Sequence, residues 1–256
     1  MIDVKDLQIT IGNRPIIHHA NFTVKNQEII GIVGASGSGK SMMMKALMGL
    51  LPYGAQAQAQ GQVRYDDGEY MDINEMHQSY KGHTLCMLPQ DSINGLHPYK
   101  TLETQMEQTF QHHHLKGGRE KIQTIFNELG LPNDERFLSS HARSLSGGMR
   151  QRVAIALCLA ANPDILIADE PTTSLDAINQ LKFITILKKL HTHHALSLLV
   201  VSHNIALVAQ IAQRLWVVHQ GTIIESGPTK EILEHPQEVH TKTLVEGCKR
   251  LYGGIL

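Results

Sequence analysis

The sequence is poor in several features that would each indicate a class of protein. It has three cysteines, Cys86, Cys158 and Cys248, and no two of them form a Cys-x-x-Cys pair. This spacing argues against a disulfide framework or a structural zinc site and is typical of reduced cytosolic thiols. The first residues, M-I-D-V-K-D-L, lack the long apolar run of a signal peptide. No apolar run reaches the roughly 18–20 residues that span a bilayer, so we expect any membrane role to act through a partner.

The chain also lacks an excess of one charge sign, since 23 Lys and Arg residues stand against 24 Asp and Glu residues. Without a basic excess the chain is poorly suited to hold a phosphodiester backbone, and we expect no nucleic-acid partner. Its content of 42% hydrophobic and 18% charged residues is typical of a soluble globular protein. A length of 256 residues is near the upper size for one core, which favours a single domain with two lobes.

The apolar pattern predicts an α/β fold with a mostly parallel sheet. Residues 2–11 and 20–25 alternate apolar and polar side chains, which indicates half-exposed antiparallel strands. Continuous apolar runs at 28–34, 165–168 and 196–202 indicate parallel strands that are covered on both faces. A hairpin is expected at 215–225, and the low-complexity stretch G-A-Q-A-Q-A-Q-G-Q-V at 54–63 is interpreted as a loop that enters a strand. Helices are predicted at 40–51, where Pro52 stops the helix, and at 101–110, 119–129, 150–161, 176–190 and from 229 onward.

The segment Gly34–Ser41, G-A-S-G-S-G-K-S, matches the phosphate-loop pattern G-x-x-x-x-G-K-[ST] in full. It lies between a predicted strand and a predicted helix, which is the context that the motif requires. In such a loop the backbone N–H groups approach the phosphates, Lys40 reaches the β- and γ-phosphates, and Ser41 ligates magnesium. A glycine-rich turn without a ligand is the alternative. The residues predicted to bind the nucleotide here are Gly34, Ala35, Ser36, Gly37, Ser38, Gly39, Lys40 and Ser41.

Two carboxylates follow the apolar strand I-L-I-A at 165–168. Asp169 at the end of the strand suits magnesium binding, as in other phosphate-loop NTPases. Glu170 is placed to orient and polarise an attacking water. A strand that exits into acidic loop residues would give the same letters, so the pair gains its meaning from the phosphate loop.

A second phosphate-binding element is predicted at Arg143–Arg152, R-S-L-S-G-G-M-R-Q-R. Its Ser-Gly-Gly opens a predicted helix, and so it offers backbone N–H groups and a positive helix end to another phosphate.

Together these motifs resemble the nucleotide-binding subunit of ABC transporters, over nearly the whole chain. Six elements of that family occur in its order, although Gln90 or His203 taken singly would be read as a surface polar residue. The elements are the Walker A loop Gly34–Ser41, the Q-loop glutamine Gln90, the signature Leu145–Met149, the Walker B end Asp169-Glu170, the D-loop Ser174-Leu175-Asp176 and the switch histidine His203 in V-V-S-H-N.

The resemblance implies a division of roles. Glu170, His203 and Gln90 would form the catalytic group, and Ser41, Gln90 and Asp169 would hold magnesium. Ser146, Gly147 and Gly148 would bind the γ-phosphate of ATP held by the opposite subunit, because the signature cannot close on its own Walker A loop. Asp176 would cross the dimer interface. The family fold implies a single domain, with residues 1–89 and 162–256 as the nucleotide-binding core and about 90–161 as an inserted helical subdomain.

Two residues that differ from the usual family sequence, together with several short segments, indicate the branch of the family that the chain resembles. Ile11 stands where the family usually stacks adenine on an aromatic ring, and Met149 stands where glutamine is commonest. Met149, the stretch D-S-I-N-G-L-H-P-Y-K-T-L after Gln90, G-L-L-P-Y-G at 49–54 and the last residues L-Y-G-G-I-L resemble the peptide/nickel importer branch. The single cysteine near the C-terminus favours nickel or another metal chelate as cargo; a dipeptide or oligopeptide importer is the alternative.

The resemblance also implies partners: a second ABC ATPase in a heterodimer, two membrane permeases and an extracytoplasmic solute-binding protein, at the cytoplasmic face of the bacterial plasma membrane. A non-transport ABC ATPase is disfavoured because no coiled-coil or zinc insertion is visible, and a binding-only subunit because Lys40, Asp169, Glu170 and His203 are all present. The sequence has 16 histidines, and two clusters of them could suggest a metal site. His112–His114 are interpreted instead as a solvated helix end, and His191, His193 and His194 as cations that suit the end of a helix.

Overall fold

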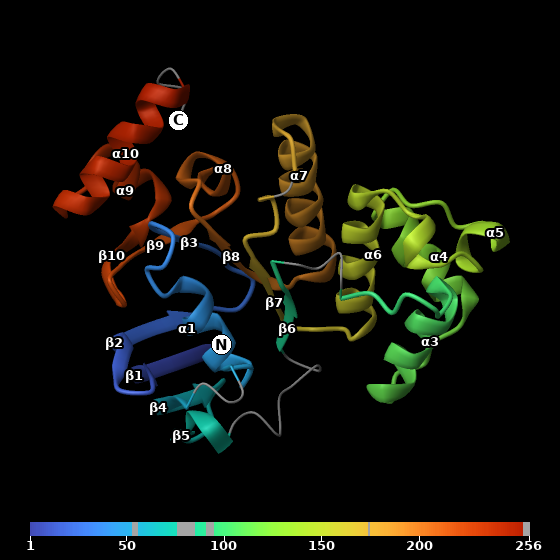
Figure 1. Cartoon of the computed structure of the whole chain (residues 1–256), viewed down its shortest axis with the longest axis horizontal. Coiled ribbons are helices and arrows are strands. Elements are labelled where there is room, and N and C mark those ends of the chain that lie inside the picture. The colour runs from blue at the N-terminus through green and yellow to red at the C-terminus, as the bar shows by residue number, and fades with distance from the viewer. Residues whose placement is uncertain (53–55, 76–84, 91–94, 174, 253–256) are drawn as a thin grey trace.

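The computed structural model describes residues 1–52, 56–75, 85–90, 95–173 and 175–252, and its elements form two sheets and a group of helices (Figure 1). The first sheet is antiparallel and has the strand order β2-β1-β4-β5. Its strands are β1 (Ile2–Ile11), β2 (Arg14–Val24), β4 (Ala57–Tyr65) and β5 (Met71–Asp72). The predicted N-terminal antiparallel strands are therefore confirmed, and β2 begins six residues earlier than the pattern indicated.

The second sheet has the order β10-β9-β3-β8-β7-β6, and all its neighbouring strands are parallel except the hairpin pair β9 and β10. Its strands are β3 (Ile29–Val33), β6 (Leu85–Leu88), β7 (Ile165–Asp169), β8 (Ser197–Ser202), β9 (Arg214–His219) and β10 (Thr222–Pro228). Every residue of β3, β7 and β8 is buried, because each strand has one apolar cluster on each face. Leu198 and Val200 of β8 face one cluster, and Leu199 and Val201 face the other.

The helices are α1 (Lys40–Leu47), α3 (Leu102–His112), α4 (Arg119–Glu128), α5 (Glu135–Leu138), the 3-10 turn η1 (Ala142–Ser144), α6 (Gly147–Ala160), α7 (Ala177–His194), α8 (Ile205–Ala209), α9 (Thr229–Glu234) and α10 (Val239–Tyr252). Figure 1 shows α3, α4 and α5 on the side of α6 that faces away from the sheets. This grouping agrees with the expected helical lobe, while its limits near residues 90 and 161 stay a prediction.

The interpretation of residues 54–63 as a loop that enters a strand placed the start of the strand too late. From Ala57 the segment is strand β4, which pairs with β1 from Ala57 opposite Ile11 to Tyr65 opposite Ile2. Alanines and glutamines alternate here, so Ala59 is buried while Gln58 and Gln60 are exposed. The alternation has the period of a strand, but alanine is too small to mark an apolar face by hydropathy alone.

Two further expectations differ from the structure. Helix α1 ends at Leu47, before Pro52, because Gly49 adopts the left-handed conformation (φ 59°) in which glycine commonly ends a helix. Strand β6 was not predicted from its four residues, Leu85–Leu88, since so short an apolar run has no readable period.

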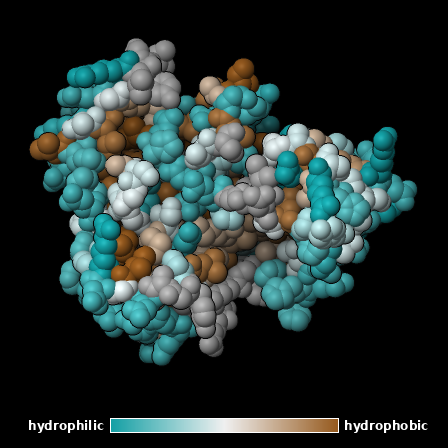
Figure 2. Space-filling model, viewed as in Figure 1, coloured by the Kyte–Doolittle hydropathy of each residue, from teal (hydrophilic) through white to brown (hydrophobic). Residues whose placement is uncertain are grey.

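Figure 2 shows a largely hydrophilic surface on the viewed face, with apolar patches interrupted by polar residues. Within the described ranges, none of the helices combines the length and the apolar character that a bilayer crossing requires.

Candidate active site

The phosphate loop joins β3 to α1 and lies close against strand β9. At Gly34 the backbone φ is 153°, and a Cβ atom there would lie 2.1 Å from the Val218 carbonyl oxygen. Only glycine permits this approach, so the first glycine of the motif is required by packing as well as by ligand access. The β9–β10 turn also holds the loop, since Gly221 N–H donates to Ser38 O (2.9 Å). The same glycine joins the turn to β2, because its carbonyl oxygen accepts from His18 N–H (2.9 Å).

Lys40 is 5% exposed and points back along its own loop. Its Nζ donates to the carbonyl oxygens of Gly34 and Ala35, each at 2.8 Å. Burial lowers the pKa of Lys40, and the negative charges of Glu170 and Asp169 oppose that shift. The ammonium group is therefore held in a site that disfavours its charge, which a phosphate would compensate.

Ser41 and Asp169 meet at the start of α1 and the end of β7. Ser41 Oγ donates to Asp169 Oδ1 at 2.6 Å, and Asp169 is 2% exposed. Burial raises the pKa of Asp169, while the Ser41 hydrogen bond lowers it. A hydroxyl and a carboxylate oxygen side by side form the oxygen donor set that magnesium prefers, so these residues fit the expected ion. The buried Ser38 Oγ has no hydrogen-bond partner among the described residues, which leaves a polar atom free for a ligand.

Glu170 follows Asp169 in the left-handed conformation (φ 46°), which is unusual for a residue with a side chain. Its N–H donates to Val201 O at 3.0 Å, and its side chain is 13% exposed. His203 Nδ1 donates to Glu170 Oε2 at 2.9 Å, and Thr173 Oγ1 donates to the same oxygen at 3.2 Å. The structure therefore brings the predicted base and the switch histidine together, and adds a hydroxyl that the motifs did not single out.

One cavity of about 650 Å³ collects most of the predicted residues. Ile11, Gln90, Glu170 and His203 line it together with the phosphate-loop residues Ser36–Ser41. Arg14, Ile16, Met42 and Thr173 also line it and were not predicted. Arg14 pairs directly with Ile11 across the β1–β2 hairpin, which is a register that the sequence pattern did not reveal.

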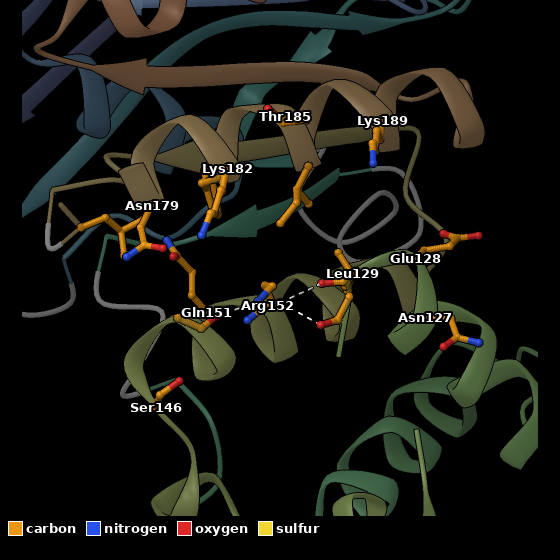
Figure 3. A pocket seen from close by; sticks show the side chains of 15 residues that line it. Asn127, Glu128, Leu129, Ser146, Gln151, Arg152, Asn179, Lys182, Thr185 and Lys189 are labelled. Atoms are coloured by element: carbon orange, nitrogen blue, oxygen red, sulfur yellow. Dashed lines mark hydrogen bonds between the residues drawn. The ribbon is translucent and has the colours of Figure 1, made fainter. Parts of the chain in front are cut away.

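The signature residues lie in a different cavity, of about 720 Å³, between α6, α4 and α7 (Figure 3). Ser146 is the N-cap of α6, and its Oγ accepts a hydrogen bond from Met149 N–H at 3.4 Å. A Cβ atom at Gly148 would meet no atom within 4 Å, so the backbone there is open. No residue that lines this cavity also lines the phosphate-loop cavity.

Two side chains of α6, which lie within the predicted element Arg143–Arg152 but were given no individual role, hold the signature helix in place. Arg152 Nη1 donates to Gly130 O at 2.8 Å and to Leu129 O at 3.3 Å, at the end of α4 (dashed lines in Figure 3). Buried Gln151 donates through Nε2 to Pro171 O, directly after the Walker B carboxylates.

Parts of the predicted D-loop and of the branch marks lie outside the described residues. These are Ser174, residues 53–54 and 91–94, and the last four residues. Asp176 is described: it is the N-cap of α7, and the hydrogen bond from Asn179 N–H (2.9 Å) lowers its pKa.

Comparison with known proteins identifies relatives over the whole length of the chain. The ABC transporter family model matches residues 17–173. The metal-staphylopine import system ATP-binding protein CntD of Staphylococcus aureus is 33% identical, over 98% of this chain and 94% of that protein. The dipeptide transport ATP-binding protein DppD of Haemophilus influenzae is 31% identical, over 99% of this chain and 79% of that protein. The chain spans 46% of the peptidoglycan transport ATP-binding protein YejF of Agrobacterium fabrum, at 31% identity.

Among solved structures, the dimeric bacterial ABC transporter cassette MJ0796 superposes with a TM-score of 0.71 at 28% identity, over 90% of this chain and 99% of that one. The cbiO1 structure from Clostridium perfringens has a TM-score of 0.77 at 21% identity, over 99% and 96% of the two chains. These likenesses confirm the predicted phosphate-loop α/β fold.

Proposed function

The chain belongs to the ABC transporter family, and we propose that within it the chain is an ATP-hydrolysing subunit that energises import. The observation that carries this proposal is the cavity that gathers the phosphate loop, Gln90, Glu170 and His203, with the Ser41–Asp169 pair beside it. ATP would lie along the N–H groups of the phosphate loop, and Lys40 would turn from Gly34 O and Ala35 O to the β- and γ-phosphates.

In the proposed reaction Glu170 accepts a proton from the attacking water, and His203 turns from Glu170 to the γ-phosphate. Magnesium held by Ser41, Asp169 and Gln90 would neutralise the charge that develops on the phosphates. The protein otherwise supplies position and electrostatic stabilisation, because phosphoryl transfer needs little covalent chemistry from it. With Ile11 and Ile16 in the cavity, adenine would meet apolar side chains in place of an aromatic ring.

The signature face is proposed to complete the site of a second subunit. Ser146 and Gly148 are exposed and line a cavity that shares no residue with the phosphate-loop cavity. Gly147 and Gly148 open α6, whose positive end suits a phosphate brought by another molecule. The solved structure of the cassette MJ0796 is dimeric, which supports this arrangement. A second ABC ATPase is therefore the proposed partner, with Asp176 at the interface.

For the cargo, the similar proteins named above favour the dipeptide or oligopeptide alternative, or a metal carried by an organic chelator, over free nickel. CntD is named for a metal-staphylopine complex, and DppD for dipeptides. We propose a small peptide or a metal chelate of similar size. Two permeases and a solute-binding protein would complete the importer, with this chain at the cytoplasmic face of the plasma membrane.

The test of the shared ATP site is Glu170→Gln, with Glu246→Gln on the exposed face of α10 as the matched control. We expect hydrolysis to fall about 100-fold or more, because a general base typically contributes that much. We also expect the variant, mixed with its partner ATPase and saturating ATP, to sediment as a stable dimer in analytical ultracentrifugation. A monomer under these conditions, or hydrolysis at the wild-type rate, would contradict the proposal.

The cargo is tested by uptake in cells that lack the gene for this chain. Labelled dipeptide, labelled nickel and a labelled nickel–chelator complex are compared, with and without the gene restored. We expect restoration for the peptide or the complex; restoration for free nickel alone would contradict the proposed cargo.

A further inference from the structure

We propose that Thr173 is a positioning residue that orients the Glu170 carboxylate for ATP hydrolysis. Its hydroxyl lies 3.2 Å from Glu170 Oε2 and 3.1 Å from the Glu170 carbonyl oxygen. Thr173 also lines the phosphate-loop cavity. The inference rests on the proposed function, because it assigns Thr173 a role only if Glu170 accepts the proton from water.

The backbone around Glu170 explains why the carboxylate needs and receives local support. The left-handed conformation of Glu170 turns the chain sharply at the end of β7. Thr173 N–H donates to Glu170 O at 3.3 Å, and this turn brings the Thr173 hydroxyl back over the residue that it supports. Thr173 thus contacts Glu170 through its backbone and its side chain at once, which restricts how far the hydroxyl can move from the carboxylate.

The two side chains that donate hydrogen bonds to Glu170 have different roles in the proposed reaction. Both His203 Nδ1 and Thr173 Oγ1 bond Oε2, and Oε1 has no hydrogen-bond partner within the described residues. Oε1 is therefore the oxygen that can accept a proton from water. The His203 side chain is 58% exposed and is the group that turns to the γ-phosphate. When it does, Thr173 remains as the donor that keeps Oε2 in place and Oε1 directed to the water.

The test compares Thr173→Val, which keeps the shape but removes the donor, with Thr173→Ser, which keeps the donor. Thr243→Val is the matched control, since Thr243 on α10 bonds only a carbonyl of its own helix (Val239 O, 3.0 Å). We expect Thr173→Val to lower kcat about tenfold with KM for ATP within about twofold of wild type, because the lost hydrogen bond orients the base and does not bind the nucleotide. Thr173→Ser should recover kcat to within about twofold. If Thr173→Val does not fold, Thr173→Ala replaces it.

A wild-type kcat for Thr173→Val, or a Thr173→Ser variant as slow as Thr173→Val, would overturn the inference. The second measurement adds Thr173→Val to Glu170→Gln. Since Thr173 acts through the carboxylate, we expect no further loss of the residual rate, and a further tenfold loss would also overturn the inference. The proposed function fails separately: it is wrong if Glu170→Gln hydrolyses ATP at the wild-type rate, whereas a slow Glu170→Gln with a fast Thr173→Val refutes only the role of Thr173.

Discussion

The phosphate loop and the signature region of this chain are built in opposite ways. In the phosphate loop, Lys40 is buried, Ser38 O bonds the β9–β10 turn, and Ser41 bonds Asp169. In the signature region, Ser146 and Gly148 are exposed, and within the described ranges the Ser146 hydroxyl bonds only the first turn of its own helix. The first region is therefore formed within one chain, and the second is exposed, as its proposed contact with another molecule requires.

The difference also appears in the electrostatics. Burial lowers the pKa of Lys40 and raises the pKa of Asp169, so both charged groups lie where their charge is disfavoured. Buried charged groups of this kind are typical of functional sites, since a bound ligand of opposite charge offsets the free energy that their burial costs. The signature region carries no buried charge of this kind among its described residues Leu145–Met149, and the phosphate binding proposed for it would depend on the positive end of α6.

The largest difference in stability between the two regions is expected when one glycine in each is replaced by alanine. Gly34→Ala places a Cβ 2.1 Å from Val218 O and should lower the free energy of unfolding by about 1–3 kcal/mol, with loss of ATP binding. Gly148→Ala meets no atom within 4 Å and should leave stability and ATP binding by the single chain unchanged. We expect it instead to prevent the ATP-dependent dimer, because the methyl group blocks the approach of a phosphate.

The measurements are chemical denaturation, binding of a fluorescent ATP analogue and ultracentrifugation. Equal effects of the two substitutions on stability would show that the contrast between the regions is wrong. A normal ATP-dependent dimer of the Gly148→Ala variant would speak against the role of the signature.

A smaller effect is expected at the link between the regions. Gln151→Met removes the hydrogen bond from α6 to Pro171 O and leaves a buried carbonyl without its partner. This should cost about 1–2 kcal/mol of stability in denaturant unfolding. Gln111→Met on the exposed face of α3 is the control and should change stability little. If both variants unfold at the same denaturant concentration, the link contributes nothing.

The smallest effect is expected at the contact between α10 and the end of β9. The ring of His240 on α10 stacks on His219 at the end of β9 (centroids 3.8 Å apart), and burial, together with the charge of His219, lowers the pKa of His240. The pKa of His240 in the folded chain lies below the unfolded value of 6.5, so between these two pKa values the folded chain binds fewer protons than the unfolded chain. The free energy of unfolding therefore falls as the pH drops below about 6.5.

His240→Phe keeps a ring and removes this titration. We therefore expect its Tm to fall less than that of the wild type between about pH 7.5 and 5.5, with exposed His235→Phe as the control. An unchanged dependence of Tm on pH in His240→Phe would exclude the contribution of this pair.

Much of the fold was predictable because long apolar runs and clear alternation mark β1, β3, β7 and β8. The strand β4 was not, because Ala57, Ala59 and Gly61 hold its first inward positions and mark an apolar face only weakly, although Val63 is buried too. The short β6 was not, because four residues have no period. In the candidate site, the phosphate loop and the carboxylate Glu170 were predicted from their motif and its context, while Gln90 and His203 came from the resemblance to the family. Thr173 was missed because a hydroxyl after Walker B has no motif of its own, and its role depends on the turn at Glu170.

The sequence by itself determined which side chains the phosphate loop and the signature region contain, because glycine, lysine and carboxylate positions in a motif act through the local backbone. Only the tertiary structure decided which distant segments support them. Gly221 bonds Ser38 O, Gln151 bonds Pro171 O, and the two cavities share no residue. These contacts depend on the order of the strands in the sheet and on the packing of α6 beside it. Such arrangements are set by the burial of the whole apolar core and not by any local pattern.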